Sequence, residues 1–306
     1  MQVHRSTDGL PYFKNAVVTI GTFDGVHAGH QKIIAALQAE AARVNGETVI
    51  ITFNPHPRRI VQPQKPLQLL NTLEEKIALL ESAAINHLVV VPFTAAFSEQ
   101  AANEYIESFL IKNFNPASII IGYDHHFGKD RSGNYKLLEE KAAEFSYHLI
   151  EIPQHVLNEI EVSSTKIRNA ILSSDVETAN RLLGYPFFFQ GKVVKGDQLG
   201  RTLGYPTANL EYADAEKIRL GHGVYAVYVT IRGQQKKGMM SIGTRPTLDK
   251  REEKVEVNVF DFEGDLYGQY LHVTVKNFLR PQEKYSSLKE MIKQLHKDKV
   301  KSMQVL

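Results

Sequence analysis

Residues 21–30 read G-T-F-D-G-V-H-A-G-H and constrain the fold more than any other part of the sequence. They follow an apolar stretch at residues 16–20 that suits a buried strand, and residues 31–43 after them have the pattern of a helix. The free N–H groups and the dipole at a helix N-terminus favour an anion, and glycines let the backbone approach it closely. The segment therefore predicts a phosphate-binding turn between a strand and a helix.

His27 and His30 add chemistry to this turn. Their spacing of three places both imidazoles on one face of the first helical turn, within reach of one phosphate oxygen. No lysine follows as in a P-loop, and Gly21, Gly25 and Gly29 miss the dinucleotide-binding spacing. Adenylyl transfer is therefore a better hypothesis than hydride transfer. An ordinary helix cap with two surface histidines would explain neither the glycines nor the histidine spacing.

Composition limits the class of protein. A chain of 306 residues is long enough for two domains. The 36 Lys and Arg nearly cancel the 34 Asp and Glu, so we expect small anionic ligands and no nucleic-acid or membrane partner. The absence of cysteine excludes disulfides and thiolate zinc sites, and no segment resembles a signal peptide or a membrane span. We expect an unexported cytoplasmic protein, of an oligomeric state that the sequence leaves open.

The first half of the chain alternates apolar strands with helical patterns, which predicts an α/β fold with a doubly wound parallel sheet. Thr72 and Glu75 form a capping-box pattern at the start of one of the helices. Ligands of such sheets bind at the carboxyl ends of the strands. Three unusual loops fall there, at residues 21–30, 54–59 and 122–133, and we expect them to share one cleft. The expected strands are residues 16–20, 48–53, 88–91, 118–121 and 147–152, and the expected helices are residues 31–43, 72–84, 98–114 and 134–146.

The second half has a different pattern. Helices at residues 166–172 and 175–183 close the first unit, and we place the domain boundary between residues 184 and 185. Short strands separated by glycine-rich turns, followed by one late helix, predict an antiparallel β-barrel with a terminal helix. The charged residues 289–301 are expected to form a solvated helix face. The expected strands are residues 224–230, 238–242, 255–260 and 271–276, and the late helix is residues 286–299.

Two further segments of the first unit carry charge that suits a phosphate chain. Residues 54–59 form a rigid loop with His56, Arg58 and Arg59, in which a binding role and a structural role for His56 are equally compatible with the sequence. Residues 163–168 place hydroxyls at a helix start and two cations in its first turn. Cations oppose the helix dipole there, so a bound phosphate would explain them.

In the second unit, residues 191–209 read G-K-V-V-K-G-D-Q-L-G-R-T-L-G-Y-P-T-A-N. This glycine density suggests backbone pressed against a ligand rather than a plain strand. Thr207 and Asn209 face the same side of an extended chain and offer hard oxygen ligands for magnesium. Glu256 lies on the polar face of an alternating strand, where by itself it is typical of a solvent-facing carboxylate.

Eight motifs occur in an order that resembles the bacterial bifunctional riboflavin kinase and FAD synthetase family. They are residues 21–30, F-N-P-H-P at 53–57, G-Y-D-H-H-F-G at 122–128, S-S-T-K-I-R at 163–168, P-T-A-N at 206–209, S-I-G-T-R-P-T at 241–247, V-E-V-N-V-F-D-F at 255–262 and L-Y-G at 266–268. The resemblance covers roughly residues 17–299. It implies that the second unit converts riboflavin and ATP to FMN, and that the first unit converts FMN and ATP to FAD and pyrophosphate, both with magnesium.

The resemblance also implies roles for single residues. His27 and His30 would bind the phosphates, Glu256 would be the general base of the kinase, and Thr207 and Asn209 would hold magnesium. The residues expected to bind nucleotide or flavin are Gly21, Phe23, Asp24, His56, Asp124, Ser163, Ser164, Thr165, Arg168, Gly191, Gly196, Gly200, Arg201, Gly204, Pro206, Asn258, Arg280 and Tyr285.

One position departs from the family pattern. His126 stands where many members have the arginine of D-F-R-F-G, and a histidine supplies less dependable positive charge. Two alternatives therefore stay open beside the bifunctional enzyme. One is a riboflavin kinase with weakened FAD synthesis, and the other is a non-catalytic flavin or nucleotide sensor, for which a retained base such as Glu256 would have no use.

Overall fold

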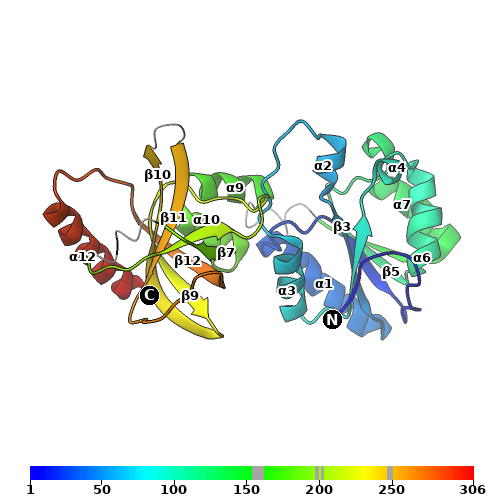
Figure 1. Ribbon diagram of the computed structural model, residues 1–306. Coiled ribbons are helices and arrows are strands. Elements are labelled where there is room, and N and C mark those ends of the chain that lie inside the picture. The colour runs from blue at the N-terminus through cyan, green and yellow to red at the C-terminus, as the bar shows by residue number, and fades with distance from the viewer. Residues whose placement is uncertain (154–161, 197–199, 201–202, 247–250) are drawn as a thin grey trace. The chain divides into compact units, whose positions relative to one another are not determined.

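A parallel sheet of six strands forms the first half of the chain in a computed structural model that describes residues 1–153, 162–196, 200, 203–246 and 251–306 (Figure 1). The strand order is β1-β4-β3-β2-β5-β6, and every neighbouring pair is parallel. The chain reverses its direction of winding between β2 and β5, which is where such sheets bind ligands. The strands are β1 (Gln2–His4), β2 (Val17–Ile20), β3 (Thr48–Asn54), β4 (His87–Pro92), β5 (Ser118–Gly122) and β6 (His148–Ile152).

Helices cover both faces of this sheet because successive strand residues point to opposite sides. Val17 and Ile50 pack with Leu37 of α1 (Ala28–Val44) and Leu80 of α3 (Leu73–Ser82). On the other face, Val18 and its neighbours pack against η1 (Tyr105–Ile111) and α7 (Tyr135–Phe145). The predicted doubly wound sheet is therefore confirmed. The remaining helices are α2 (Pro57–Val61), α4 (Ala95–Ser98), α5 (Ala102–Glu104), α6 (Lys112–Phe114) and η2 (Lys129–Arg131).

Local details of this unit differ in part from the sequence expectations. The Thr72–Glu75 capping box is confirmed, since each side chain binds the backbone N–H of the other residue. The helix expected at residues 98–114 is confirmed from Ala102 to Phe114, with a π-helical middle, but its start is wrong because α4 ends at Ser98 and α5 begins only at Ala102. β1 was not expected, because three residues in a mostly polar segment give no periodic signal.

A closed six-stranded antiparallel barrel and a long terminal helix follow, as predicted. Its strand order is β10-β11-β8-β7-β12-β9. β7 contains Gly191 and β8 contains Asn209, so the expectation that residues 191–209 avoid plain strands is wrong at both ends. The elements are β7 (Phe188–Val194), β8 (Ala208–Tyr212), β9 (Gly223–Ile231), β10 (Gln234–Pro246), β11 (Arg251–Val259), β12 (Tyr270–Arg280) and α12 (Leu288–Val305).

The chain divides into two compact units, residues Met1–Ser163 and Ser164–Leu306. Helices α9 (Ser164–Leu172) and α10 (Val176–Leu183) belong to the second unit. Asn180 of α10 donates a hydrogen bond to the carbonyl of Val275 in β12, at 3.0 Å, and accepts one from the N–H of Phe187, at 2.6 Å. These bonds tie α10 to the barrel. The boundary that we predicted between residues 184 and 185 stays a prediction of where the two family domains meet.

Candidate functional site

The turn between β2 and α1 has an unusual backbone. Phe23 and Val26 have positive φ angles of 46° and 37°, and Gly25 has a φ of 95°. Such angles cost a non-glycine residue about 1–3 kcal/mol and persist only where the surroundings enforce them. The buried Asp24 carboxylate provides one restraint, because its Oδ1 accepts hydrogen bonds from the N–H groups of Leu70, at 2.9 Å, and Asn71, at 3.3 Å.

His27 and His30 lie together at the start of α1. His27 is the N-cap residue, and its Nδ1 accepts a long hydrogen bond of 3.4 Å from the N–H of His30. The two rings stack with their centroids 3.7 Å apart and their planes 18° apart, and the Phe23 ring lies 4.9 Å from His30. The structure thus brings together the pair that the sequence spacing selected, at a helix N-terminus.

The surroundings of His30 favour an uncharged ring in the free protein. Burial, followed by the neighbouring His27 and Lys76, holds the pKa of His30 well below its ordinary value. The Nδ1 atom of His30 is buried and has no hydrogen-bond partner among the described residues. An imidazole of this kind can donate or accept one further hydrogen bond, which an anion at the helix start would provide.

The three loops that we expected in one cleft follow β2, β3 and β5, which are the adjacent central strands of the sheet. Their common position at the carboxyl edge is therefore confirmed. In the second loop, His56 caps α2 and accepts a hydrogen bond of 3.1 Å from the N–H of Arg58. In the third loop, Asp124 and His126 are exposed, whereas the Nε2 atom of His125 is buried without a partner in the described part of the chain.

Gly21 and Asp24 differ in what they contact. A Cβ atom on Gly21 would lie 3.3 Å from the Phe23 ring, so this position needs glycine to keep the ring in place. The Asp24 carboxylate is buried and accepts hydrogen bonds from the backbone N–H groups of Leu70 and Asn71.

The predicted phosphate-binding segment 163–168 falls at the border between the two units. Ser163 ends the first unit, whereas Ser164, Thr165 and Arg168 belong to α9 in the second. A phosphate-binding role of residues 163–168 stays a prediction.

In the barrel, the register brings the predicted kinase residues together. Glu256 of β11 is paired directly with Asn209 of β8, and Val257 with Ala208. Asn258, two residues along β11, donates a hydrogen bond of 2.6 Å to the carbonyl of Pro206. The strand that carries the carboxylate therefore also holds the P-T-A-N segment in place.

The glycines of residues 191–209 make close contacts with this segment. A Cβ atom on Gly196 would lie 2.0 Å from the Asn209 amide nitrogen, and one on Gly200 would lie 3.1 Å from the Thr207 hydroxyl oxygen. A side chain at Gly196 would collide with the Asn209 amide, and one at Gly200 would collide with the Tyr205 carbonyl oxygen, 2.3 Å away, and crowd Thr207. Gly204 has a φ of 77°, which favours glycine on conformational grounds. Arg201 lies outside the described residues.

Thr207 and Asn209 fit a magnesium ion that is held jointly with nucleotide phosphates. Both offer neutral, hard oxygen donors, and they lie two residues apart at the start of β8. Among the described residues, no group of three or more His, Asp or Glu side chains could hold a metal ion by itself. A metal here would therefore depend on phosphate and water oxygens for most of its ligands.

A cavity of about 300 Å³ opens beside the P-T-A-N segment. Apolar side chains form most of its lining, which suits a flat heterocycle, and the Thr207 hydroxyl and the acidic residues Glu263 and Asp265 are its polar part. Its walls are formed by Val193, Pro206, Thr207, Ala208, Val257, Val259 and residues 262–267, which include Leu266 and Tyr267 of the L-Y-G motif.

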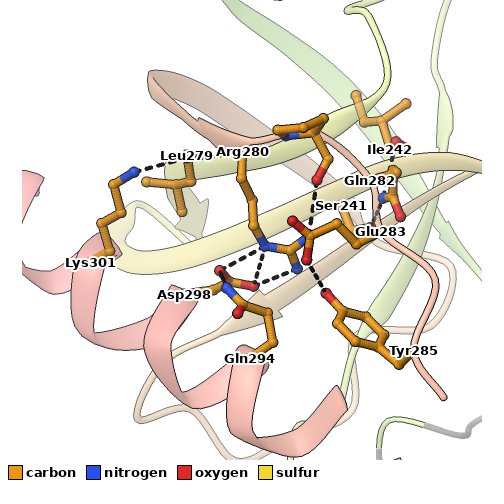
Figure 2. Close-up of polar contacts among 11 residues, drawn as sticks. Ser241, Ile242, Leu279, Arg280, Gln282, Glu283, Tyr285, Gln294, Asp298 and Lys301 are labelled. Atoms are coloured by element: carbon orange, nitrogen blue, oxygen red, sulfur yellow. Dashed lines mark hydrogen bonds and ion pairs between the residues drawn. The ribbon is translucent and has the colours of Figure 1, made fainter. Parts of the chain in front are cut away.

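Arg280 and Tyr285 lie together near α12, with the guanidinium carbon 5.9 Å from the centre of the Tyr285 ring. Figure 2 shows that the guanidinium also faces Asp298 of α12, with Nη2 2.7 Å and Nε 2.9 Å from the two carboxylate oxygens. Gln294 donates a further hydrogen bond of 2.9 Å to Asp298. Asp298 is only 2% exposed and is an exception to the expected solvated face of residues 289–301, whose other charged residues are exposed or half-buried.

Sequence reasoning missed two charged residues at these sites, Lys76 and Asp298. Lys76 follows the capping box on α3, and its Nζ donates to the carbonyl of Thr22 at 2.6 Å. A charge pattern on an amphipathic helix is normally solvated, so only the tertiary structure reveals that these two residues are buried.

Comparisons with known proteins match two family models to the two parts of the chain. The FAD synthetase family model matches residues 11–166, and the riboflavin kinase family model matches residues 183–306. A bifunctional riboflavin kinase/FMN adenylyltransferase from Buchnera aphidicola subsp. Schizaphis graminum is 36% identical over 288 residues, which cover 93% of this chain and 92% of the relative. The protein of the same name from Escherichia coli (strain K12) is 32% identical, covering 94% of this chain and 91% of its own.

A solved structure matches nearly the whole chain. It is described as a macrolide-efflux protein from Streptococcus pneumoniae, has a TM-score of 0.88 and 31% identity, and the match covers 99% of this chain and 98% of that one. None of the helices in the described part of the present chain combines the length and the hydropathy that a bilayer crossing requires.

Proposed function

The chain belongs to the family of bifunctional riboflavin kinases/FMN adenylyltransferases, and we propose that its two family domains divide the two reactions between them. Residues 185–306 phosphorylate riboflavin to FMN with ATP, and residues 1–184 adenylylate FMN to FAD with release of pyrophosphate. The observation that carries this division is the match of two different family models to two different segments, each with its own set of polar residues.

In the kinase reaction, the terminal hydroxyl oxygen of the ribityl chain attacks the γ-phosphorus of ATP, and ADP leaves. Glu256 accepts the hydroxyl proton, a role that contributes about 10²- to 10⁴-fold in rate. Its place opposite Asn209 supports this role, because the base then lies beside a residue that holds the phosphates through magnesium. Magnesium would neutralise charge on the transferring phosphoryl group when it is bound at Thr207 and Asn209.

In the adenylyl transfer, a phosphate oxygen of FMN attacks the α-phosphorus of ATP, and the bond to the pyrophosphate oxygen breaks. No proton has to be removed from an FMN phosphate that is already ionised. His27, His30 and the N-terminus of α1 stabilise the negative charge that develops in the transition state. The stacked geometry of the rings supports joint action on one phosphate group.

A second candidate, a riboflavin kinase with weakened FAD synthesis, is favoured by one observation. His126 occupies the position of the family's usual arginine, and the structure leaves its side chain exposed. A histidine supplies less dependable positive charge than an arginine, so an anionic substrate would be bound less strongly there.

Separate supply of each substrate tests these functions. With ATP and magnesium, the purified protein is expected to form FMN when it is given riboflavin and FAD when it is given FMN. FMN formation without any FAD from supplied FMN would favour the second candidate. Binding of flavins without turnover in either assay would contradict both and leave a sensor.

The cytoplasm is the compartment that we propose for these reactions. The chain holds no cysteine, which agrees with a reducing environment without requiring one. The proposed partners are the small molecules riboflavin, FMN and ATP.

A further inference from the structure

Lys76 is a buried cation beside the histidine pair. It lies on α3 with 6% of its surface exposed, and its Nζ donates hydrogen bonds to the Thr22 carbonyl at 2.6 Å and to the Thr52 hydroxyl at 3.3 Å. Burial lowers its pKa to about 8, although the Asp24 carboxylate opposes this shift. Burying an ammonium group costs free energy, and an apolar side chain would fill this position at a lower cost.

The hydrogen bonds of Lys76 act on the strained turn. Thr22 directly precedes Phe23, the first residue of this turn with a left-handed backbone. The Thr22 carbonyl also accepts a hydrogen bond of 3.1 Å from the hydroxyl of Thr52. Two donors on two different elements, α3 and β3, therefore fix one carbonyl at the entrance of the turn. The turn leads directly to His27, the N-cap residue of α1.

The charge of Lys76 acts on the histidines. The titratable groups that interact electrostatically with His30 are His27 and Lys76. Lys76 interacts in the same way with the Asp24 carboxylate. A fixed positive charge at this place disfavours a second one on His30 while the site is empty. Once a phosphate chain enters, the same charge attracts it.

We propose that Lys76 is a positioning residue of the adenylyl-transfer site, which holds the Thr22 carbonyl and the turn that directs His27 and His30, and supplies a fixed positive charge behind the bound phosphates. The inference rests on the proposed adenylyl transfer by the first unit. It adds a residue from α3 to a site that the sequence motif confines to β2 and α1.

Two variants separate the hydrogen bond from the charge. Lys76→Met keeps the length and apolar stem of the side chain and removes both the donors and the charge. Thr52→Val removes the second donor to Thr22 together with the weaker of the two acceptors of Lys76, and leaves the charge and its bond to Thr22 in place. Lys136→Met, at an exposed position of α7, is the matched control for loss of a lysine charge.

Each variant is assayed for FAD formation from FMN and for FMN formation from riboflavin, and the titration of the His30 ring is followed by NMR, assigned with a His30→Gln variant. We expect Lys76→Met to lower kcat for FAD formation by about 10- to 100-fold with a smaller change in KM for ATP, because Lys76 acts through the turn. FMN formation should stay within about twofold of wild type, and the pKa of His30 should rise. Thr52→Val should lower FAD formation without moving the pKa of His30, and Lys136→Met should change neither.

Unchanged FAD formation in Lys76→Met, or an unchanged His30 titration in a folded variant, would overturn the inference. If Lys76→Met unfolds the first unit, which thermal unfolding would reveal, wild-type FAD formation in Thr52→Val overturns the role of the turn. A wild-type protein that forms no FAD would instead contradict the proposed function, and the His30 titration would still test the electrostatic role of Lys76.

Discussion

Glu256 of β11 lies directly opposite Asn209 of β8 in the antiparallel register of the barrel. Residues that face each other in this way have Cβ atoms about 4.5–5.5 Å apart. The predicted base and a predicted magnesium ligand are therefore held beside each other by backbone pairing, without depending on a mobile loop. The same pairing makes separate tests of the two reactions possible, because it lies wholly within the second unit.

Replacement of Glu256 by Gln should selectively abolish the kinase reaction. The amide keeps the shape of the side chain but cannot accept the hydroxyl proton, so we expect FMN formation to fall by about 10²- to 10⁴-fold. FAD formation from supplied FMN should stay at the wild-type rate. Initial rates with each flavin substrate measure both. Glu211→Gln, at an exposed position of β8, is the control, and equal loss in both variants would contradict the assignment.

Replacement of His27 by Asn should have the opposite effect. Asparagine is a good N-cap residue, so α1 keeps its cap while the stacked imidazole is lost. FAD formation from FMN should fall by roughly 10²- to 10³-fold, as is usual when one charge-stabilising donor is removed. FMN formation from riboflavin should not change. Rates of FAD formation at the wild-type level would show that His27 is only a helix cap.

The Arg280–Asp298 ion pair should couple α12 to the end of β12. Both side chains are largely buried, so Asp298→Asn leaves a guanidinium with a weaker partner and is expected to lower the free energy of unfolding by about 3 kcal/mol. Urea unfolding of Asp298→Asn, Arg280→Met and the double variant measures the coupling. The double variant should lose less stability than the two single variants added together. Strict additivity would mean that the pair does not connect the two elements.

His125 should make folding stability depend on pH. Burial lowers the pKa of His125 to about 4. The charge of Asp124 opposes this shift, and His126 and Arg131 add smaller contributions to it. A group whose pKa is lower in the folded protein binds a proton more strongly in the unfolded protein. Its stabilising contribution is complete above its ordinary pKa, near 6.5, and is lost as the pH falls towards about 4.

From about pH 7.5 to about pH 5, this loss should amount to roughly 2 kcal/mol. Urea unfolding at both pH values measures it, and His125→Gln should flatten the dependence by that amount. The exposed neighbour provides the comparison, since His126→Gln removes only one of the smaller contributions to the pKa of His125 and should flatten the dependence far less than His125→Gln. The same slope in wild type and His125→Gln would contradict the assignment.

Much of the phosphate site could be predicted from the sequence because its elements are contiguous. The glycines, the histidine spacing and the strand before them all lie within residues 16–30, and local rules describe such a segment well. The alternation of strands and helices likewise predicted the sheet, and with it the common edge of the three loops.

Features that depend on distant packing could not be predicted in this way. Lys76 and Asp298 lie on helices whose charged residues look solvated, and only contacts with Thr22 and Arg280 reveal their burial. Gly191 discouraged a strand prediction, yet its missing side chain allows the close approach of Leu210 on the neighbouring strand. In each case the partner lies far away along the chain, outside any local pattern.

The most direct test of the account is a time course of flavins, separated by chromatography, after the purified protein is mixed with riboflavin, excess ATP and magnesium. We expect FMN to rise first and then to fall as FAD accumulates, because the product of one site is the substrate of the other. Accumulation of FMN without FAD would contradict the bifunctional assignment and direct attention to His126, and unchanged riboflavin would contradict catalysis by either site.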